Sequence, residues 1–357
     1  MQAMDSINIT RATKLAAKPE DSSLGFGQKF SDHWFRYDYD EGKGWHDARI
    51  LPYAHLPLNP AAAVLHYAQA VFDGLKAFHG VDGKIRLFRP KKHVERLNRS
   101  AERLCMPTLD PEFVLEAIVK LVEMEREWVP KTIGTSLYIR PTMIATEPFL
   151  GVRPAKAYTY FVILSPVGAY YPTGLAPVKI RVEEHDVRAV EGGLGIAKTG
   201  ANYAASLRAG ENAKHDGYSQ VLYLDGVQRR YLEEVGTMNI MVLIGEEVIT
   251  PPLGGTILAG VTRDSVLHLL RSWGIKASER QLSIDEVVAA HKRGELAEVW
   301  GTGTAAVISP VGELAYKDMH LTINNGSIGP LTQRLFDAIV RIQYGRDPAP
   351  EGWVLEI

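Results

Sequence analysis

The first half of the chain alternates apolar segments of helical length with shorter, strand-like segments. Three segments that begin at or beside a proline predict helices, over residues 61–72, 91–105 and 111–128. Asp110 stands just before the third of these segments and is expected to cap its helix. Residues 30–51 form a strand-rich stretch, in which Gly42 and Gly44 mark a turn. Shorter apolar runs predict strands over residues 75–78, 84–88, 135–145 and 157–167.

Glycine and proline interrupt this pattern after residue 167. Further along, helices are predicted over residues 261–273, 283–294 and 330–345, and strands over residues 218–224, 240–244, 247–250, 296–300 and 305–310. Ser283 and Glu286 form a capping box, and residues 301–304 predict a tight Gly/Thr loop. The changes of pattern predict an N-terminal arm, a small domain, a linker and a large domain, at residues 1–25, 26–167, 168–178 and 179–357.

Composition and charge exclude several classes of protein. The chain has 357 residues, of which 46% are hydrophobic, and no apolar run approaches the length of a membrane span. Lys and Arg number 40 against 42 Asp and Glu, so the net charge of −2 gives no electrostatic reason to expect nucleic-acid binding. The single cysteine, Cys105, excludes an internal disulfide and a multi-cysteine metal site. Because the first 25 residues also lack an apolar signal segment, we expect a cytoplasmic protein. A chain of this length can bury a sizeable core, so we expect that it needs no metal to fold.

Lys198 lies in a segment of small residues, E-G-G-L-G-I-A-K-T-G at residues 191–200. A lysine that forms a Schiff base with a planar cofactor needs such neighbours, because the cofactor must come within bonding distance of the chain. A flexible glycine loop that carries a solvated lysine explains the same pattern. The segment alone leaves both interpretations open.

Glu234 lies in the segment Y-L-E-E-V-G-T-M-N, just before a strongly apolar strand. A carboxylate held there is costly to bury unless it has a partner. A protonated pyridine nitrogen is a suitable partner, since a carboxylate beside it keeps the ring protonated and able to accept electrons. A glutamate that faces water at the end of a strand, or that pairs with its neighbour Glu233, is the alternative.

Two Gly/Thr segments are candidates for binding a phosphate. Residues 254–262 lead directly into a predicted helix, whose first N–H groups form a natural anion site. Thr262 adds a hydroxyl donor in the first turn, and residues 301–304 offer a second loop of similar composition. Glycine before a helix is most often only a turn, and no Walker-type nucleotide motif is present.

Arg140 lies inside an apolar strand, in the run Tyr138–Ile139–Arg140. A buried guanidinium needs an anionic partner. The carboxylate of a substrate would serve through a bidentate contact, and an Asp or Glu of the chain itself would serve equally well.

Taken together, these segments resemble the branched-chain amino acid aminotransferases, which belong to the fold-type IV pyridoxal-phosphate enzymes. The resemblance extends from about residue 30 to residue 345 and is closest to the long-form branch that includes the animal enzymes. It is carried by L-H-Y-A-Q-A-V-F-D-G-L-K-A-F (65–78), R-L-F-R-P (86–90), R-S-A-E-R-L-C-M-P (99–107), G-T-S-L-Y-I-R-P (134–141), E-P-F-L-G-V (147–152), G-A-N-Y (200–203), E-V-G-T-M-N (234–239), G-V-T-R (260–263), G-T-G-T-A (301–305) and I-Q-Y-G (342–345).

The resemblance implies how the cofactor, pyridoxal 5'-phosphate, would be bound. Lys198 would be bonded to it covalently, Tyr203 would hydrogen-bond to its phenolic oxygen and Glu234 would pair with its ring nitrogen. The residues expected at its phosphate are Arg96, Val261, Thr262 and Thr304.

The resemblance also implies a substrate site. The α-carboxylate would meet backbone N–H groups at Thr237 and Ala305, and Arg140 would help to accept the distal carboxylate of glutamate. Tyr67 and Val152 would reach into the pocket of a neighbouring subunit, so a homodimer is expected. The walls of the side-chain pocket would be formed by Phe30, Phe72, Tyr138 and Tyr203.

The fold that the resemblance implies is a mixed α/β (α+β) fold-type IV architecture. It has a smaller N-terminal α/β domain and a larger C-terminal domain with a mixed sheet or open barrel, and it binds the cofactor between them. The implied reaction is transamination of L-leucine, L-isoleucine and L-valine with 2-oxoglutarate, which gives branched 2-oxo acids and L-glutamate. The amine of Lys198 would move the substrate's α-proton.

The sequence departs from the family at one notable site, and two alternative functions are compatible with part of the pattern. Mammalian relatives carry a C-x-x-C pair at the positions of Ala306 and Ser309, so thiol control at this site is excluded here. Another fold-type IV activity, such as a D-amino acid or amine transaminase or an aminodeoxychorismate lyase, shares the lysine and the glutamate. A non-catalytic pyridoxal-phosphate carrier would need neither a substrate arginine nor an aromatic pocket.

Overall fold

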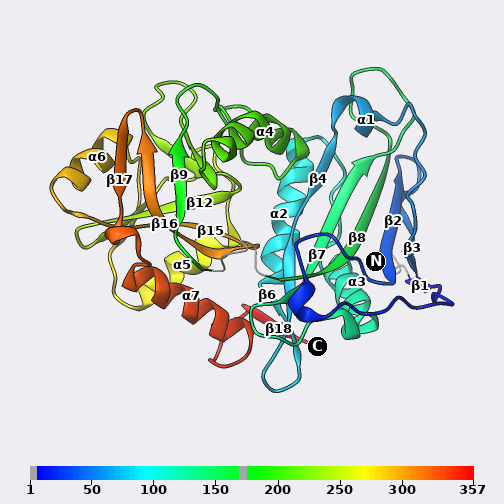
Figure 1. Ribbon diagram of the computed structural model, residues 1–357. Coiled ribbons are helices and arrows are strands. Elements are labelled where there is room, and N and C mark those ends of the chain that lie inside the picture. The colour runs from blue at the N-terminus through cyan, green and yellow to red at the C-terminus, as the bar shows by residue number, and fades with distance from the viewer. Residues whose placement is uncertain (1–5, 169–174) are drawn as a thin grey trace. The chain divides into compact units, whose positions relative to one another are not determined.

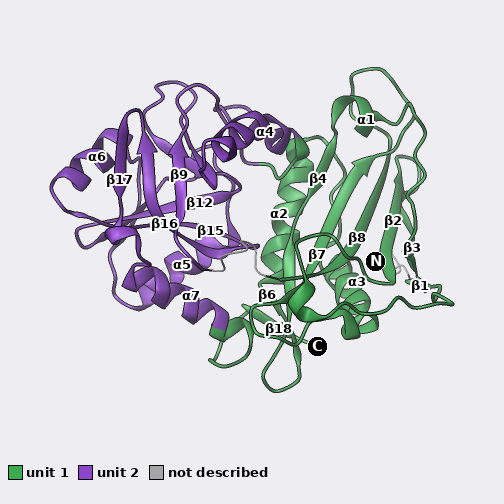
Figure 2. Ribbon diagram, in the orientation of Figure 1, with its two compact units in different colours: residues 1–170, 197–200, 341–357 green, residues 171–196, 201–340 purple. Residues whose placement is uncertain are grey.

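The computed structural model describes residues 6–168 and 175–357 and forms two compact units (Figures 1 and 2). Unit 1 comprises the described part of Met1–Tyr170 together with Ala197–Gly200 and Arg341–Ile357, and unit 2 comprises the described part of Tyr171–Ile196 together with Ala201–Val340. The sequence placed residues 197–200 and 341–357 in the second domain, whereas in the structure they belong to unit 1. Of the predicted linker, residues 169–174 lie outside the described residues.

Unit 1 is built on one sheet, in the strand order β1-β3-β2-β8-β7-β5-β6-β18, with β4 paired to β7. Its strands are β1 (Asn8–Ile9), β2 (His33–Asp40), β3 (Gly44–Pro52), β4 (Ala70–Phe72), β5 (Leu75–His79), β6 (Ile85–Phe88), β7 (Ser136–Ala145), β8 (Ala157–Val167) and β18 (Val354–Glu356). Its helices are α1 (Ala63–Tyr67), α2 (Pro90–Arg103) and α3 (Pro111–Met124), with short 3-10 turns at Asp21–Ser23 and Arg126–Trp128.

Strand β7 packs one of its two faces against the core of unit 1. Leu137, Ile139 and Met143 are fully buried in one cluster with residues of α2 and α3, such as Leu97 and Ile118. Side chains alternate between the two faces of a strand. Tyr138 and Arg140 therefore lie on the opposite face of β7, away from that core.

The predicted helix over residues 61–72 is wrong in its second half. Helix α1 ends at Tyr67, because Ala68 has a positive φ of 52° and its N–H closes the last turn on the carbonyl of Val64. Residues Ala70–Phe72 instead form β4, in which Val71 pairs with Met143. A short apolar run fits a buried strand as well as a helix, and here the pairing partner decides.

The other helices predicted in unit 1 are confirmed to within a few residues. Helix α2 covers Pro90–Arg103, and α3 ends at Met124 and is followed by the 3-10 turn. The cap on α3 is also confirmed, because the side chain of Asp110 accepts the N–H groups of Glu112 and Phe113 at 3.0 and 3.4 Å.

Unit 2 contains a β-barrel, which confirms the mixed fold class. The barrel is closed, where the sequence left a mixed sheet or an open barrel as the expectation. The strand order is β11-β10-β9-β16-β15-β12-β13-β14, and a further pairing of β11 with β12 closes six of these strands into a barrel (Figure 1). The strands are β9 (Val178–Val182), β10 (Gln220–Leu224), β11 (Leu232–Val235), β12 (Met238–Ile244), β13 (Glu247–Thr250), β14 (Ala277–Glu279), β15 (Leu296–Gly303), β16 (Val307–Tyr316) and β17 (Met319–Thr322).

The helices of unit 2 surround the barrel (Figure 1). They are α4 (Gly200–His215), α5 (Val261–Ser272) and α6 (Ile284–Lys292), followed by a 3-10 turn at Asn324–Gly326 and by α7 (Pro330–Gln343), which continues into unit 1. Helix α6 contributes Ile284, Val287 and Ala290 to the same apolar cluster as the barrel strands. The predicted cap on α6 is confirmed, since Ser283 Oγ accepts the N–H of Glu286 at 3.1 Å. Helix α4 was not predicted, because its apolar positions form no clear stripe.

The predicted Gly/Thr loop at residues 301–304 is wrong, since strand β15 continues to Gly303. The two glycines serve packing: a Cβ at Gly301 would lie 2.9 Å from Met238 Cε, and one at Gly303 would lie 3.0 Å from Met238 Cγ. The turn instead covers Thr304–Ala306.

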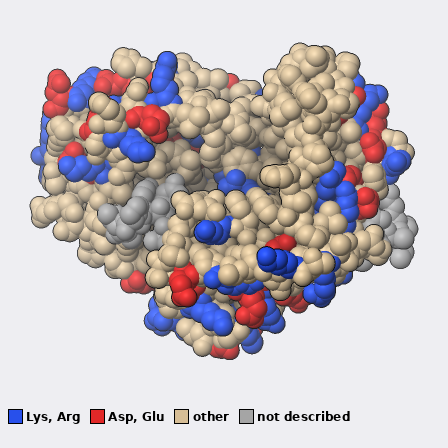
Figure 3. Space-filling view, turned by 45° about the vertical axis from the view of Figure 1, so that its right-hand side comes forward, with Lys and Arg blue, Asp and Glu red and all other residues tan. Residues whose placement is uncertain are grey.

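The surface of the described residues carries charges of both signs and includes a group of exposed apolar side chains in unit 1. On the face drawn in Figure 3, basic and acidic side chains are interspersed. In the described part of the chain, no helix has the length and apolar character needed to cross a membrane. Large apolar side chains are exposed on α1 and on the loop after β7, namely Leu65, Tyr67, Phe149, Leu150 and Val152.

Candidate active site

The backbone of Lys198 is fixed against strand β4 in unit 1. Its N–H donates to Ser100 Oγ at 2.9 Å, and its carbonyl accepts the N–H of Phe72 at 3.0 Å. The next residue, Thr199, forms a β-bridge with Val71 and donates its hydroxyl to the carbonyl of Ala70 at 2.7 Å. The lysine is therefore half-buried and held on a sheet, which argues against a flexible loop with a solvated amine.

The amine of Lys198 lies in surroundings that favour its neutral form. Its Nζ is 4.9 Å from the ring centre of Phe72. Loss of solvent lowers the pKa of Lys198 to about 8, and the positive charge of Arg96 acts in the same sense. A larger fraction of this amine than of an ordinary lysine is therefore neutral and nucleophilic near neutral pH.

Arg96 is oriented by Asp73, a residue that the sequence reasoning missed. Asp73 is completely buried and accepts from Arg96 Nε at 2.8 Å and Arg96 Nη2 at 2.7 Å, while His93 Nδ1 lies 2.7 Å away. Burial alone would raise the pKa of Asp73, but Arg96 and His93 hold it well below its usual range. The local sequence carried no signal for these contacts, because His93 and Arg96 lie 20 and 23 residues further along the chain.

Tyr138 and Arg140 lie on the face of β7 that is directed away from the core, and Phe72 joins them. Arg140 Nη2 donates to the hydroxyl of Tyr138 at 3.1 Å, and the guanidinium carbon lies 4.7 Å from the ring centre of Phe72. Within the described ranges no carboxylate forms an ion pair with Arg140, and its Nε is buried without a hydrogen-bond partner. The alternative of an internal Asp or Glu partner is therefore not what the structure shows.

Phe30, expected in the pocket wall, stacks on Tyr53 with ring centres 5.3 Å apart. Phe26, four residues earlier, packs edge-on against Tyr138 at 5.1 Å. Both phenylalanines lie in a segment without helix or strand, so no periodicity in the sequence indicates which of the two side chains packs against Tyr138. Phe26 is thus a further candidate that the sequence did not single out.

Glu234 is buried on strand β11 of unit 2, only 4% exposed. Asn239 Nδ2 donates to Glu234 Oε1 at 2.8 Å, and Arg188 forms an ion pair with Glu234 Oε2. The carboxylate is therefore not a solvent-facing residue at the end of a strand. Glu233, its neighbour, is also buried, and burial raises the pKa of Glu233.

Thr237 and the Thr304–Ala305 pair lie in two turns at the same end of the barrel. Strands β12 and β15 are antiparallel neighbours, and their register places Asn239 opposite Thr302. Thr237 just precedes β12, and Thr304 just follows β15. The register therefore brings these two turns together, as the roles expected for them require.

Helix α5 begins beside the same residues. Its N-cap, Gly260, has no side-chain cap, and a Cβ there would lie 1.9 Å from Asn239 Oδ1. Val261 and Thr262 form its first turn, with their leading N–H groups available to an anion. Thr302, which lies opposite Asn239, has a buried hydroxyl that finds no hydrogen-bond partner within the described part of the chain.

Three further candidates have simpler surroundings. Tyr203 is half-buried in the first turn of α4. Tyr67, at the end of α1, donates its hydroxyl to the carbonyl of Leu150. Val152 is 87% exposed, so the described residues of unit 1 leave its side chain almost uncovered.

Each unit thus holds its own group of candidates. Unit 1 brings together Lys198, Arg96, Phe72, Tyr138 and Arg140, and unit 2 brings together Glu234, Thr237, Val261, Thr262, Thr304 and Ala305. Two open pockets on the described surface, of about 530 Å³ in unit 2 and about 500 Å³ in unit 1, are lined by none of these residues. We therefore identify the candidate active site from these two groups of side chains and not from the two pockets.

Comparison with known proteins shows the family of the chain. Residues 70–314 match the model of the family described as amino-transferase class IV. The chain is 55% identical over 341 residues to branched-chain-amino-acid transaminase 1 of Bacillus subtilis (strain 168), covering 95% of this chain and 96% of that protein. It is 52% identical to branched-chain-amino-acid aminotransferase 2 of the same organism, covering 99% and 97%.

Solved structures show the same fold. The crystal structure of the Escherichia coli branched-chain amino acid aminotransferase superposes with a TM-score of 0.74 at 26% identity, covering 89% of this chain and 98% of that one. The branched-chain amino acid aminotransferase of Thermobaculum terrenum, solved in its PLP-bound holo form, gives a TM-score of 0.74 at 21% identity, covering 92% and 99%. Because the family model matches more than half of the chain and relatives above 50% identity extend over nearly all of it, the chain belongs to the class IV aminotransferases and, among them, to the branched-chain amino acid aminotransferases.

Proposed function

We propose that this protein transfers the amino groups of L-leucine, L-isoleucine and L-valine to 2-oxoglutarate, with pyridoxal phosphate as cofactor. The observation that carries the proposal is the group in unit 1, where Lys198, with a pKa lowered to about 8, shares one sheet face with aromatic rings and with Arg140. This reaction requires a nucleophilic amine, an apolar surface and a guanidinium that is open to a substrate carboxylate, and among the described residues Arg140 forms no ion pair with an acidic side chain.

The residues present fit pyridoxal phosphate. An amine, a buried carboxylate and a helix start that lacks a side-chain cap match its aldehyde, its ring nitrogen and its phosphate. The buried Thr302 hydroxyl beside α5 is an additional donor that has no acceptor among the described residues. We propose that Lys198 binds the aldehyde carbon, Tyr203 the phenolic oxygen and Glu234 the ring nitrogen, and that the phosphate is held by Arg96, Val261, Thr262 and Thr304.

When bound, pyridoxal phosphate supplies an electron sink that stabilises negative charge at the substrate's α-carbon. Glu234 holds a proton at the ring nitrogen, and Asp73 keeps Arg96 aimed. Lys198 Nζ would accept the proton from the substrate's α-carbon and donate it again, because its lowered pKa of about 8 leaves part of the amine neutral. The backbone N–H groups of Thr237 and Ala305 orient the substrate carboxylate.

The pocket must accept both an apolar side chain and a second carboxylate. We propose that Phe30, Phe72, Tyr138 and Tyr203 offer the apolar surface, and the contact of Phe26 with Tyr138 supports adding Phe26. Burying a branched side chain there is favourable by roughly 1.5–3 kcal/mol, and one methylene separates substrates by only about 1–3 kcal/mol. We therefore expect all three amino acids to be accepted, with modest preference among them.

Steady-state rates with 2-oxoglutarate test this proposal. L-leucine, L-isoleucine and L-valine should be good donors, and D-alanine should be inert. A D-amino acid or an aryl amine that outcompetes leucine would assign the site to another fold-type IV activity. Bound cofactor without any transamination would favour a non-catalytic carrier.

We also propose a homodimer, in which Tyr67 and Val152 complete the neighbour's pocket. The exposed apolar side chains on α1 and on the loop after β7 support this, because isolated monomers rarely leave such a cluster in water. Sedimentation velocity at micromolar concentration measures it directly, and a fully active monomer would refute it.

Arg140→Met should impair glutamate and 2-oxoglutarate more than leucine. Only the dicarboxylates present a second carboxylate to the guanidinium, and a lost charge-assisted contact costs about 1.5–3 kcal/mol. The measured quantity is the ratio of kcat/KM for glutamate and leucine, in wild type and variant. The matched control is Arg293→Met, an exposed arginine paired with Glu295. An unmoved ratio would make Arg140 structural and leave the distal carboxylate to another group.

Arg96→Ala should mainly weaken retention of the cofactor. Loss of one charge-assisted contact to the phosphate predicts a dissociation constant raised roughly 10- to 150-fold. Because the change also leaves buried Asp73 without its main partner, thermal unfolding of the cofactor-free variant is measured in parallel. Arg96→Lys keeps the charge and serves as the comparison. If both variants bind pyridoxal phosphate as tightly as wild type, Arg96 does not contact it.

A further inference from the structure

Arg188 belongs to unit 2 and stands in the chain between β9 and the small-residue segment that leads to Lys198. Its guanidinium contacts three different groups. It forms an ion pair with Glu234, donates from Nη1 to the carbonyl of Thr256 at 3.0 Å, and donates from Nη2 to the carbonyl of Gly195 at 3.3 Å. Its side chain is only 8% exposed. None of the roles assigned above uses this residue.

Each of the three groups belongs to a segment that carries a proposed cofactor contact. Gly195 is three residues before Lys198, and Thr256 is six residues before Thr262. The segments touch one another directly, since a Cβ at Gly195 would lie 2.1 Å from the carbonyl oxygen of Thr256. One guanidinium therefore connects strand β11, which carries Glu234, to the segment that precedes Lys198 and to the segment that precedes helix α5.

The charge of Arg188 matters as much as its hydrogen bonds. A buried carboxylate that keeps its charge needs an opposite charge nearby, because burial alone favours its protonated form. Asn239 gives Glu234 a neutral donor, and Arg188 gives it a cation. A protonated Glu234 would donate a hydrogen bond to the ring nitrogen instead of accepting one from a protonated ring nitrogen.

We infer that Arg188 is a positioning residue that keeps Glu234 ionised and aims it at the cofactor's ring nitrogen, while fixing the segments that lead to Lys198 and Thr262. This inference rests on the proposed function. A lysine would not replace it, because a single ammonium lacks the rigid planar fork that serves acceptors in three directions.

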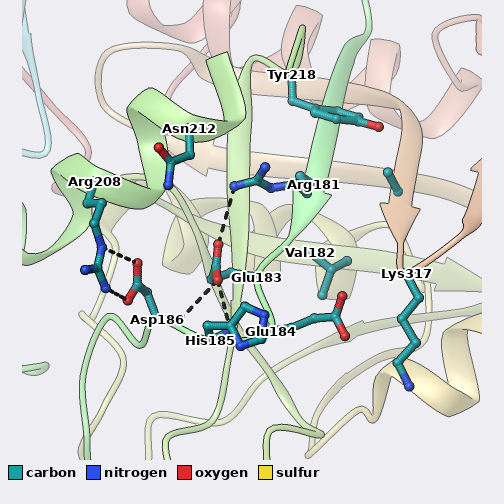
Figure 4. A pocket seen from close by; sticks show the side chains of 11 residues that line it. Arg181, Val182, Glu183, Glu184, His185, Asp186, Arg208, Asn212, Tyr218 and Lys317 are labelled. Atoms are coloured by element: carbon teal, nitrogen blue, oxygen red, sulfur yellow. Dashed lines mark hydrogen bonds and ion pairs between the residues drawn. The ribbon is translucent and has the colours of Figure 1, made fainter. Parts of the chain in front are cut away.

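The same loop offers a matched control. Two residues before Arg188, Asp186 forms an ion pair with Arg208 of α4, and Glu183 accepts the N–H groups of His185 and Asp186 at 2.9 and 3.1 Å (Figure 4). Arg208 is 77% exposed and contacts the loop from outside. Arg208→Ala therefore removes an ion pair from this loop without touching Glu234.

A double-mutant cycle tests the inference, using Arg188→Gln, Glu234→Gln and the double variant in the cofactor-loaded enzyme. Arg188→Gln should lower the single-turnover rate with L-leucine at least tenfold, shift the pH titration of the visible absorbance band, and do neither once Glu234 is already Gln. Arg188→Lys should restore the titration better than the rate, and Arg208→Ala should change neither. The dissociation constant of pyridoxal phosphate and thermal unfolding without cofactor are measured for every variant.

Additive effects in the cycle would overturn the inference, because Arg188 would then act independently of Glu234. An Arg188→Gln variant with wild-type rate and titration would overturn it as well. If Arg188→Gln does not fold, the same cycle with Arg188→Lys decides. A silent Glu234→Gln is a separate outcome, which refutes the proposed role of Glu234 itself.

Discussion

Lys198→Ala should abolish transamination and remove the covalent attachment of pyridoxal phosphate. The amine is proposed to act twice, as the group that bonds to the cofactor and as the base at the substrate's α-carbon. Loss of a positioned general base alone costs roughly 10²- to 10⁴-fold in rate. The fold should survive, because the bonds that fix this segment come from the backbone of Lys198 and from the hydroxyls of Ser100 and Thr199.

The measurement is borohydride reduction of the loaded protein, followed by peptide mapping. The adduct should lie on Lys198 in wild type and be absent in the variant. Lys76 is the matched control, since it is buried in the same unit and burial also lowers the pKa of Lys76 to about 8. Lys76→Ala should keep the adduct, and an adduct mapped to Lys76 would show that the assignment is wrong.

The pH dependence of labelling gives an independent check on Lys198. A base whose pKa is lowered to about 8 is mostly protonated below that pH and neutral above it. Reductive methylation of Lys198 in the cofactor-free protein should therefore increase with a midpoint near pH 8. A midpoint close to the ordinary pKa of lysine, about 10.4, would mean that the amine is solvated.

The sequence singled out the residues that we propose to carry chemistry, but not the residues that we propose to position them. Lys198 and Glu234 stand in local patterns, a small-residue segment and a charged residue beside an apolar strand, that are visible without a structure. Asp73 and Arg188 act through contacts with residues 23 and 46 positions away. No local pattern marks such partners, so only the fold reveals that one aims Arg96 and the other meets Glu234.

The errors in secondary structure arose where tertiary pairing decides. The run at residues 70–72 is as apolar as a helix would need, but it forms a strand because β7 offers it partners. Gly301 and Gly303 look like a loop, yet they are strand residues because Gly301 pairs with Ile240 of β12 and Gly303 pairs with Val307 of β16. Met238 packs closely over both glycines. In both cases a pairing strand, β7 or β12, lies in a distant part of the sequence.

Glu234→Gln should slow transamination by orders of magnitude while the cofactor still binds. The amide keeps the size of the side chain, but it carries no charge and cannot stabilise a protonated ring nitrogen as a carboxylate does. The electron sink is then weaker when charge develops at the α-carbon. The contacts proposed for the phosphate lie on other residues, so the dissociation constant should change much less than the rate.

Single-turnover absorbance with L-leucine separates the rate of the chemical step from cofactor binding. Glu233→Gln is the matched control, because Glu233 is the adjacent residue on β11 and is equally buried, and burial raises the pKa of Glu233. No contact with the cofactor is proposed for Glu233, so the rate of this variant should stay near that of wild type. If the two variants slow the reaction equally, the effect comes from damage to β11 and not from a charge at the ring nitrogen. A near-normal rate in Glu234→Gln alone would remove Glu234 from the site, and with it the reason for Arg188 to carry a buried positive charge there.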